Sequence, residues 1–432
     1  MSDQPQRLYT HCKELVTLMD GAPTGSRRGA DLREVGVVED GAVAVLDGRI
    51  LATGPTSDIQ ARYPETPRVD LAGYVVLPGF VDCHTHPVFS RTREDEFHMR
   101  CGGADYMEIA AAGGGILNSS LRTREASSEH LATVVEENLD RFLENGTTTV
   151  EAKSGYGLTT ESEVKSLQVL TQVIANHAIT GRRTFLGAHE FPAEFRGSDE
   201  GREEYVRLVV DEMLPAVDGL CEACDVFAEP GVFDRAQSER IMLAAKEQGL
   251  RLRMHVDEIL PMGGAELAVE LGADSADHLG RVSLQGIEDL AGSQTTAVLL
   301  PGTTFYLGKT QHAPARRMID AGCSIALATD FNPGSCYTQS MPLIITLACV
   351  LLHMTPEECI HATTINPAAS LQLDSEVGSL HPGKRADMVV MDLPSYRALG
   401  YQMGGNRVVM TIAGGEPVVV NTHDRSIPAL EC

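Results

Sequence analysis

The chain has 432 residues, of which 43% are hydrophobic and 22% charged, as is typical of a soluble globular protein with more than one structural unit. Its formal net charge is −25, which argues against nucleic acid or an anionic membrane as a partner, because both select basic surfaces. The longest apolar run, residues 343–352, is shorter than the roughly 20 residues of a membrane span.

The two ends of the chain share a β pattern. Residues 1–20 contain no long apolar core, so we expect no signal peptide. Residues 33–77 and 378–420 both alternate short β-like runs with Gly and Asp turns. We therefore predict a small β-sandwich domain made of residues 1–77 and 377–432.

The middle of the chain, residues 78–376, alternates short apolar runs with helical periodicity. This alternation predicts a parallel sheet, and eight strands are the number that closes a (β/α)8 TIM-like barrel. The eight candidate strands are VLPGFVDCH, TTTVEA, RTFLGAH, CDVFAE, LRLRMHV, SADHL, TAVLLPG and CSIALATD. The predicted fold class is thus α/β, a barrel with a β-sandwich.

Helix signals separate these strands. Apolar residues at helical spacing predict a helix over 129–145, ended by Gly146. Thr160 and Glu163 form a predicted capping box at the start of the next helix. The segment 85–128 is long and rich in glycine, which predicts a lid or a binding loop.

Histidine and aspartate side chains follow the predicted strands. His84 and His86 form a His-x-His pair whose side chains share one face of a strand, and His255 and Asp330 end two later strands. Because strand ends converge at the mouth of a barrel, these four side chains predict a single catalytic metal with one position left for water. Zinc suits this ligand set, and iron or manganese fits by ligand type.

His278 ends another strand and leaves two interpretations open. In a two-metal site it would bind the second ion, with Lys153 or Glu229 as the bridging ligand. In a one-metal site it would polarise the attacked carbonyl or hold the water, and we favour this version.

Longer motifs narrow the prediction. The His-x-His after PGFVD and the run GKRADMVVMD are similar to the amidohydrolase superfamily. The runs CHTHPVFSRTREDEF, EAKSGYGLTTESE, TFLGAHEFP and LATDFNPGSC resemble the imidazolonepropionase family over nearly the whole chain. The resemblance implies a metal-dependent cyclic amidohydrolase of histidine degradation. Such an enzyme opens 4-imidazolone-5-propanoate to N-formimidoyl-L-glutamate.

The resemblance also implies residue roles. It places one metal ion per chain on His84, His86, His255 and Asp330. This ion is zinc or iron, and it is divalent or trivalent. It places substrate contacts on a second set of residues, which are Arg93, Tyr106, Tyr156, His189, Glu258, Asn332, Gly334 and Ser335. Where the family commonly has AHAVP this chain has AHEFP, so Glu190 adds a carboxylate beside His189.

The chemistry of this substrate assigns the roles further. A guanidinium clamps the propanoate tail, and we expect Arg93 to supply it and the competing Arg91 and Arg100 to be solvated. Tyr156 supplies a hydroxyl, and His189 donates to the ring carbonyl or the tail. The catalytic set is Asp330, His278 and Glu258. Either Asp330 or Glu258 delivers the proton to the leaving nitrogen, and we expect Asp257 to turn outward.

Rival functions share the scaffold. A nucleobase or cyclic-amidine deaminase would use the same metal set without a cation for a carboxylate tail. A hydantoinase-like hydrolase would hold two metals, and a binding protein on an inactive barrel would not need the full ligand set. Ten cysteines without a repeating framework favour a cytoplasmic location, and the resemblance implies a homodimer.

Overall fold

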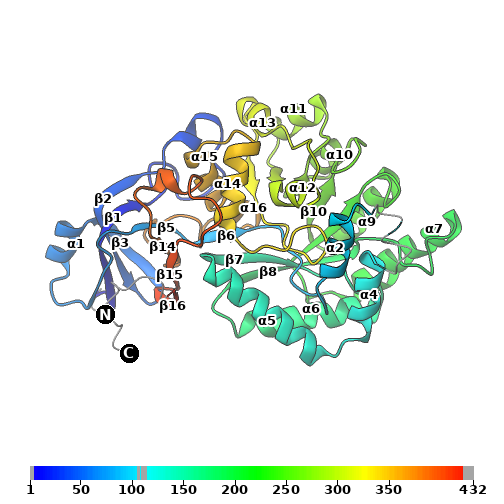
Figure 1. Ribbon diagram of the computed structural model, residues 1–432, viewed down its shortest axis with the longest axis horizontal. Helices are drawn as coiled ribbons and strands as arrows, with labels where there is room; N and C mark the ends of the chain where they lie inside the picture. The colour runs from blue at the N-terminus through cyan, green and yellow to red at the C-terminus, as the bar shows by residue number, and fades with distance from the viewer. Residues whose placement is uncertain (1–3, 105–107, 109–113, 422–432) are drawn as a thin grey trace.

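The computed structural model describes residues 4–104, 108 and 114–421, which form a barrel and a mixed sheet side by side (Figure 1). Eight parallel strands follow one another around the barrel in chain order. They are β6 (Phe80–Asp82), β7 (Thr147–Lys153), β8 (Thr180–Ala188), β9 (Ala223–Ala228), β10 (Arg251–Val256), β11 (Ser275–His278), β12 (Thr296–Leu299) and β13 (Ile325–Leu327). Each overlaps one of the eight predicted runs, so the predicted (β/α)8 barrel is confirmed.

The barrel closes between β13 and β6 through residues just beyond the two strands. The main-chain N–H of Asp330 donates to the carbonyl of His84 at 3.1 Å, and that of His86 donates to the carbonyl of Phe331 at 2.8 Å. These bonds bring the first and last strands together. His84, His86 and Asp330, distant in sequence, therefore meet at one point of the barrel mouth.

Helices cover the outside of the barrel, as Figure 1 shows. Those after β6 and β7 are α2 (Glu94–Cys101), α4 (Ile116–Glu125), α5 (Ser128–Glu144) and α6 (Thr160–Ala175). After β8 to β11 come α7 (Asp199–Leu208), the π-helical turn Val209–Met213, α8 (Leu214–Ala216), α9 (Arg235–Glu247), α10 (Gly264–Leu271) and α11 (Leu284–Gly292). After β12 and β13 come α12 (Pro301–Tyr306), α13 (Ala315–Ala321), α14 (Met341–Leu351), α15 (Pro356–Ala362) and α16 (Ile365–Ser370).

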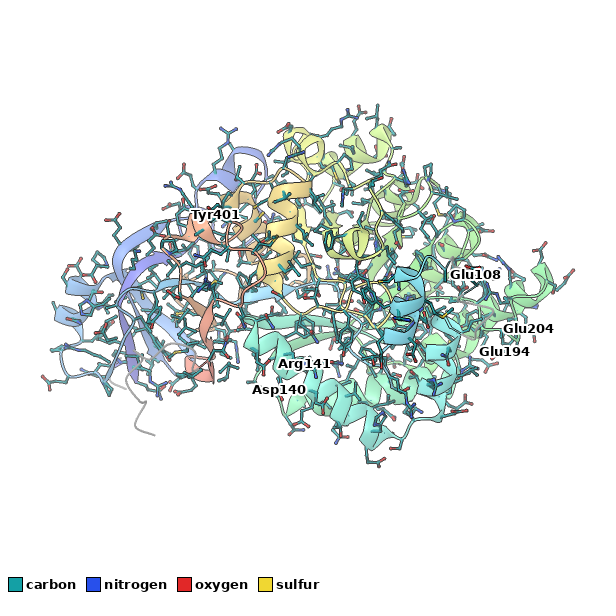
Figure 2. The ribbon with its side chains drawn as sticks, in the orientation of Figure 1. Glu108, Asp140, Arg141, Glu194, Glu204 and Tyr401 are labelled. Carbon is teal, nitrogen blue, oxygen red and sulfur yellow. The ribbon has the colours of Figure 1, made fainter. Side chains whose placement is uncertain are left out.

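The outer helices are amphipathic. In α5 the side chains Leu131, Val135 and Leu139 are buried at helical spacing, which confirms the predicted helix. Acidic side chains such as Asp140 and Glu194 are exposed on the outside of the molecule (Figure 2). Such side chains contribute part of the negative charge and remain solvated.

Both ends of the chain build the second unit, as predicted. Its strands are β1 (Arg7–Val16), β2 (Val37–Leu46), β3 (Arg49–Pro55), β4 (Arg68–Asp70), β5 (Val75–Pro78), β14 (Met388–Met391), β15 (Val408–Ala413) and β16 (Glu416–Val420), with α1 (Thr56–Arg62) after β3. They hydrogen bond as one mixed sheet in the order β16-β15-β14-β5-β1-β2-β3, with β4 also on β1. An irregularity between Tyr9 and Cys12 divides β1, which pairs with β4 before it and with β5 after it. The short elements Gly29–Arg33 and Tyr396–Ala398 are 3₁₀ helices.

The chain passes directly from this sheet into the barrel at Gly79, between β5 and β6. The N–H of Gly79 donates to the carbonyl of Asp387 at 2.9 Å, beside β14. A Cβ at Gly79 would clash with the side chain of Thr148 in β7, so the tight approach requires glycine. The predicted run VLPGFVDCH is therefore two strands in two sheets. The boundaries 1–77, 78–376 and 377–432 stay a prediction.

The predicted capping box at α6 is wrong in its partners. Thr159, not Thr160, is the N-cap, and its hydroxyl accepts from the N–H of Ser162. Glu163 is fully buried and turns back into the preceding turn, where its carboxylate accepts from the N–H groups of Gly155, Gly157 and Leu158 at 2.7–2.9 Å. Glu163 therefore folds the SGYGL turn instead of capping the helix.

Replacing Glu163 with alanine is expected to lower the free energy of unfolding by about 3 kcal/mol, because three buried N–H groups would lose their acceptor. Urea denaturation measures this loss. The exposed Glu161, on the same first turn of α6, provides the matched control variant Glu161→Ala. Equal stability of the two variants would contradict the role given to Glu163.

Within the long segment 85–128 the described residues include two helices, α2 and α4. Its helices were not predicted because their apolar periodicity is weak. Among the described residues no helix combines the length and hydropathy needed to cross a bilayer. The nine cysteines within the described ranges are free thiols.

Candidate active site

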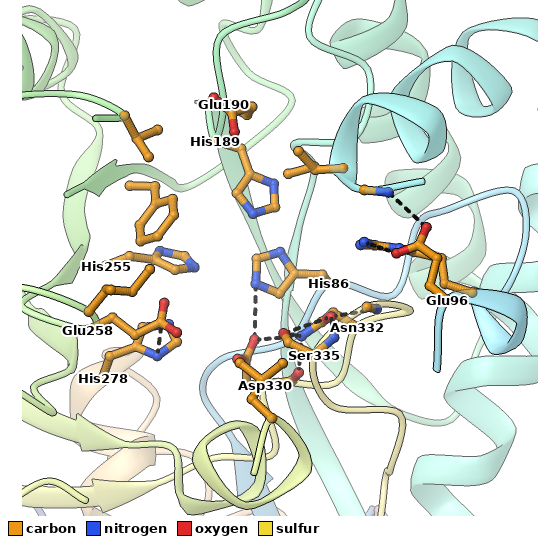
Figure 3. Close-up of a pocket in the computed structure, with 18 of the residues that line it drawn as sticks. His86, Glu96, His189, Glu190, His255, Glu258, His278, Asp330, Asn332 and Ser335 are labelled. Carbon is orange, nitrogen blue, oxygen red and sulfur yellow. Dashed lines mark hydrogen bonds and ion pairs between the residues drawn. The ribbon is translucent and has the colours of Figure 1, made fainter. Parts of the chain in front are cut away.

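A cavity of about 580 Å³ opens at the carboxyl ends of the barrel strands (Figure 3). Most of the predicted site residues line it, namely His86, Arg93, Tyr156, His189, His255, Glu258, His278, Asp330, Asn332, Gly334 and Ser335. His84 is completely buried beside this set. Tyr106 lies outside the described residues. The structure therefore brings together the predicted residues that it describes.

Three histidines and one aspartate at the floor of the cavity cluster with the buried His84. The Nε2 atoms of His84 and His86 are 3.3 Å apart, and Oδ1 of Asp330 lies 3.6 and 3.4 Å from them. The ring centre of His84 lies 4.4 Å from that of His255 and 5.6 Å from that of His278. Two triplets have ligand atoms within 4.8 Å of one another: His84, His255 and His278, and His84, His86 and Asp330.

Buried carboxylates orient two of these rings from below. Nδ1 of His84 lies 2.6 Å from Asp277, and Nδ1 of His255 lies 3.0 Å from Asp225. An imidazole that donates through Nδ1 keeps its Nε2 lone pair free, so each ring presents a ligand atom to the shared gap. Nε2 of His278 is buried and has no hydrogen-bond partner among the described residues. These donors fit a divalent cation between them.

A cluster of buried charges supports the orienting carboxylates. Nζ of Lys153 binds Glu151 and Asp225, each at 2.7 Å, and all three side chains are fully buried. Glu229, the other bridging candidate considered for a two-metal site, accepts main-chain N–H groups of residues 258–260. Lys153 and Glu229 are therefore both bound by other protein groups in this structure.

The protonation states of His84 and Asp330 suit a metal site. Burial and the positive field of Lys153 hold the pKa of His84 well below its usual value, so the ring is neutral. Burial would raise the pKa of Asp330, but hydrogen bonding with His86, the field of His278 and the hydroxyl of Thr303 outweigh it and lower the pKa. Oδ2 of Asp330 accepts from Thr303 at 2.5 Å. Neutral imidazole and ionised carboxylate are the forms that bind metal.

The main chain is strained at two of these residues. His278 has φ 77° and Asp330 has φ 51°, which place both in the left-handed region that side chains other than glycine rarely occupy. The barrel mouth imposes these conformations at the points where the chain leaves β11 and β13. Strain of this kind is concentrated at functional sites.

The loop after β13 forms one wall of the cavity. Oδ1 of Asn332 accepts from the N–H groups of Gly334 and Ser335, and Nδ2 of Asn332 donates to the carbonyl of Asp330 at 2.7 Å. Asn332 therefore folds the loop in addition to facing the cavity. A Cβ at Gly334 would clash with the guanidinium of Arg93, which packs directly on this glycine.

His189 and Tyr156 form the opposite wall. The ring of His189 stacks on His86 at 5.1 Å, and its Nδ1 lies 2.9 Å from the carbonyl of Gly155. Burial lowers the pKa of His189 far below its usual value, so the neutral ring donates to Gly155 and presents an acceptor at Nε2. We therefore expect His189 to accept a hydrogen bond from a ligand, whereas the sequence suggested a donor. Burial keeps Tyr156 a neutral hydroxyl by raising its pKa.

Two charged residues at the rim, Asp257 and Arg100, differ from the sequence prediction, while Arg91 and Glu258 agree with it. Asp257 does not turn to solvent: it is buried, and it accepts the N–H groups at the start of α10. Arg100 is not a solvated arginine but lines the cavity, whereas Arg91 is exposed and lies outside it. Glu258 faces the cavity between Lys309, at 3.2 Å, and His278, at 3.7 Å.

Sequence reasoning missed the residues that hold the site in place. Asp225 and Asp277 orient ligand rings, Thr303 fixes Asp330, and Glu96 binds Arg93. A signal for the first two was present, because a charged residue within an apolar strand is buried only when it is paired. The contacts of Thr303 and Glu96 left no comparable signal in the sequence.

Comparisons with known sequences agree with this geometry. Residues 75–418 match the Amidohydrolase family, and residues 41–65 match the imidazolonepropionase-like composite domain of bacteria. Imidazolonepropionase from Symbiobacterium thermophilum is 47% identical over 412 residues, which cover 94% of this chain and 95% of the relative. That from Geobacillus kaustophilus is 47% identical over 415 residues, with 94% and 96% covered.

Solved structures share the fold at lower identity. An adenosine deaminase from Xanthomonas campestris with bound zinc has a TM-score of 0.71 and 21% identity, with 96% of this chain and 93% of that chain covered. Guanine deaminase from E. coli has a TM-score of 0.72 and 15% identity, with 96% and 99% covered. These likenesses show the fold alone, while the relatives at 47% identity match almost the whole length. The chain therefore belongs to the imidazolonepropionase family of the amidohydrolases.

Proposed function

We propose that this chain hydrolyses the cyclic amide bond of 4-imidazolone-5-propanoate to give N-formimidoyl-L-glutamate. The observation that carries the proposal is one cavity that combines a His/Asp metal-binding cluster with arginines on its wall. A five-membered lactam with a carboxylate tail needs both features. The family of the chain supports the same substrate.

We assign a single zinc or iron ion to His84, His86, His255 and Asp330. His84 and His86, whose pKa values burial lowers, and the ionised Asp330 are donors that such an ion takes. Burial would lower the pKa of His255, but Asp225 outweighs it and raises the pKa, so we expect this ring to lose a proton when the ion binds. When bound, the ion supplies the Lewis acidity that makes water nucleophilic near neutral pH. His278 remains outside this set, with its unpartnered Nε2 facing the cavity for the substrate carbonyl.

The other wall residues orient the substrate. Arg93 receives the propanoate tail, and the loop of Asn332, Gly334 and Ser335 lies beside it. The acceptor Nε2 of His189 suits a ring N–H of the imidazolone. These contacts hold the lactam carbonyl over the metal-binding cluster and raise its effective concentration there. Tyr106 stays a predicted contact.

Ring opening then needs one proton transfer. A new C–O bond forms at the lactam carbonyl, and His278 donates a hydrogen bond to the oxygen that becomes negative. Asp330 takes the proton of the attacking water and gives it to the ring nitrogen as the C–N bond breaks. We favour Asp330 over Glu258 for this transfer because Glu258 is already engaged by Lys309 and His278.

The test is an absorbance assay of enzymatically generated imidazolonepropanoate with the purified, metal-loaded chain. We expect its absorbance to decay with formation of N-formimidoyl-L-glutamate, identified by mass spectrometry. Adenosine, guanine and hydantoin are the comparison substrates for the rival deaminase and hydantoinase functions. Faster turnover of any of these than of imidazolonepropanoate would overturn the proposal.

A further inference from the structure

Among the described residues, three lysine and arginine side chains line the active-site cavity, and two of them have carboxylate partners. Nη2 of Arg93 lies 2.5 Å from Glu96, and Nζ of Lys309 lies 3.2 Å from Glu258. The third, Arg100, forms no ion pair with any residue in the described ranges. Its charge is therefore available to an anionic ligand of this cavity.

Contacts with its surroundings hold the Arg100 guanidinium on the cavity wall. Nη2 donates to the carbonyl of Gly334 at 3.1 Å, and Cζ lies 5.6 Å from the ring centre of Tyr306. Nη1 is buried, yet it has no hydrogen-bond partner within the described part of the chain. An unsatisfied, buried N–H group of a cation costs free energy unless a ligand accepts its hydrogen bond.

Arg93 and Arg100 converge on the same glycine. Arg93 is the N-cap of α2 and Arg100 lies in its last turn, and both guanidinium groups reach Gly334. The Arg93 guanidinium packs against Gly334, and Arg100 binds its carbonyl oxygen. Nε of Arg93 is buried without a partner among the described residues, like Nη1 of Arg100. Nε of Arg93 and Nη1 of Arg100, both unpartnered among the described residues, therefore belong to guanidinium groups that lie at the Gly334 wall of the cavity.

Arg93 alone does not provide a counterion for a carboxylate bound in the cavity, because its charge is balanced by Glu96. Glu96 holds Arg93 through one carboxylate oxygen and accepts the N–H of Gly115 through the other, so the pair has no net charge (Figure 3). A carboxylate buried beside a neutral pair would lack a counterion, and burial of an unpaired charge is unfavourable. Arg100 supplies the missing positive charge.

We propose that Arg100 is a second carboxylate-binding residue, which together with Arg93 holds the propanoate tail of the substrate, while Glu96 orients Arg93. This inference rests on the proposed function. It assigns the tail to the wall formed by α2 and Gly334, and it makes Arg100 a determinant of specificity for substrates with an anionic tail.

The experiment compares Arg100→Gln and Arg100→Lys with the unchanged chain on two substrates, imidazolonepropanoate and the same ring with a neutral propanamide tail. We expect Arg100→Gln to raise KM for the propanoate by about 10-fold to 100-fold, the usual worth of a charge-assisted hydrogen bond, with a smaller change in kcat. KM for the propanamide should stay within about twofold. Arg100→Lys should fall between, because it keeps the charge but loses the planar fork.

Arg122→Gln is the matched control, since this arginine lies on the neighbouring α4 but is exposed and bonds only Asn118 among the described residues. Circular dichroism and thermal unfolding establish that each variant is folded. An unchanged KM for the propanoate in Arg100→Gln, or an equal loss for both tails, would overturn the inference while the unchanged chain still supports the proposed function. No turnover of imidazolonepropanoate by the unchanged chain would overturn both.

Discussion

Substitution of His255 by alanine is expected to lower turnover of imidazolonepropanoate by about 1,000-fold or more, because the variant loses an imidazole of the metal-binding cluster. Chelation of the unchanged chain should cause the same loss. Added zinc or iron should restore the chelated chain but not the variant. Elemental analysis after dialysis should give about one ion per unchanged chain, since we assign a single catalytic site.

The matched control is His177→Ala, since His177 pairs with the exposed Asp140, precedes the amino end of β8 and is not among the residues that line the cavity. This variant should retain both metal and turnover. Two ions firmly bound per unchanged chain would contradict the single-ion assignment. Full activity of His255→Ala would contradict the role of the cluster itself.

Substitution of Asp330 by asparagine is expected to lower kcat by about 1,000-fold with little change in KM, because an amide cannot take up the proton of the attacking water. Asparagine is also a weaker ligand, so the metal content of the variant must be measured under the same conditions. When kcat is expressed per bound ion, partial loss of metal no longer contributes to the difference. We expect most of the decrease in kcat to remain after this correction.

Thr303→Val provides a graded comparison for Asp330. It removes the hydroxyl of Thr303, which donates to Oδ2 of Asp330, and leaves the carboxylate in place. We expect a fall in kcat of roughly tenfold, the worth of one hydrogen bond to a charged group. If Asp330→Asn fell no further than Thr303→Val at equal metal content, Glu258 would replace Asp330 as the proton carrier.

The barrel and its cluster could be predicted because their signals are local. Each barrel strand is a short apolar run, and the polar residue that follows it marks the carboxyl end. His84, His86, His255 and Asp330 all occupy such positions, so the closure of a parallel barrel alone brings them together. The metal-binding cluster is therefore a consequence of strand order.

What could not be predicted depends on contacts between distant side chains. Nothing near Glu163 in sequence distinguishes a capping residue from one that binds three N–H groups of the preceding turn. The sequence prediction places Arg100 in solvent because arginine side chains are mostly exposed. Its contact with Gly334, 234 residues away, appears only when the loop after β13 folds over α2.

The passage from β5 to β6 ties the chemistry to both chain termini. Strand β6, which precedes His84 and His86, begins after Gly79, and the N–H of Gly79 donates to the carbonyl of Asp387. A second contact joins the two units, because the hydroxyl of Thr411 in β15 donates to the carbonyl of Leu143 at the end of α5. A protein shortened to its barrel would lose both hydrogen bonds, and the amino end of β6 would no longer be fixed. We therefore expect the sheet formed by the two ends of the chain to stabilise β6, and its deletion to abolish activity although it contributes no residue to the metal-binding cluster.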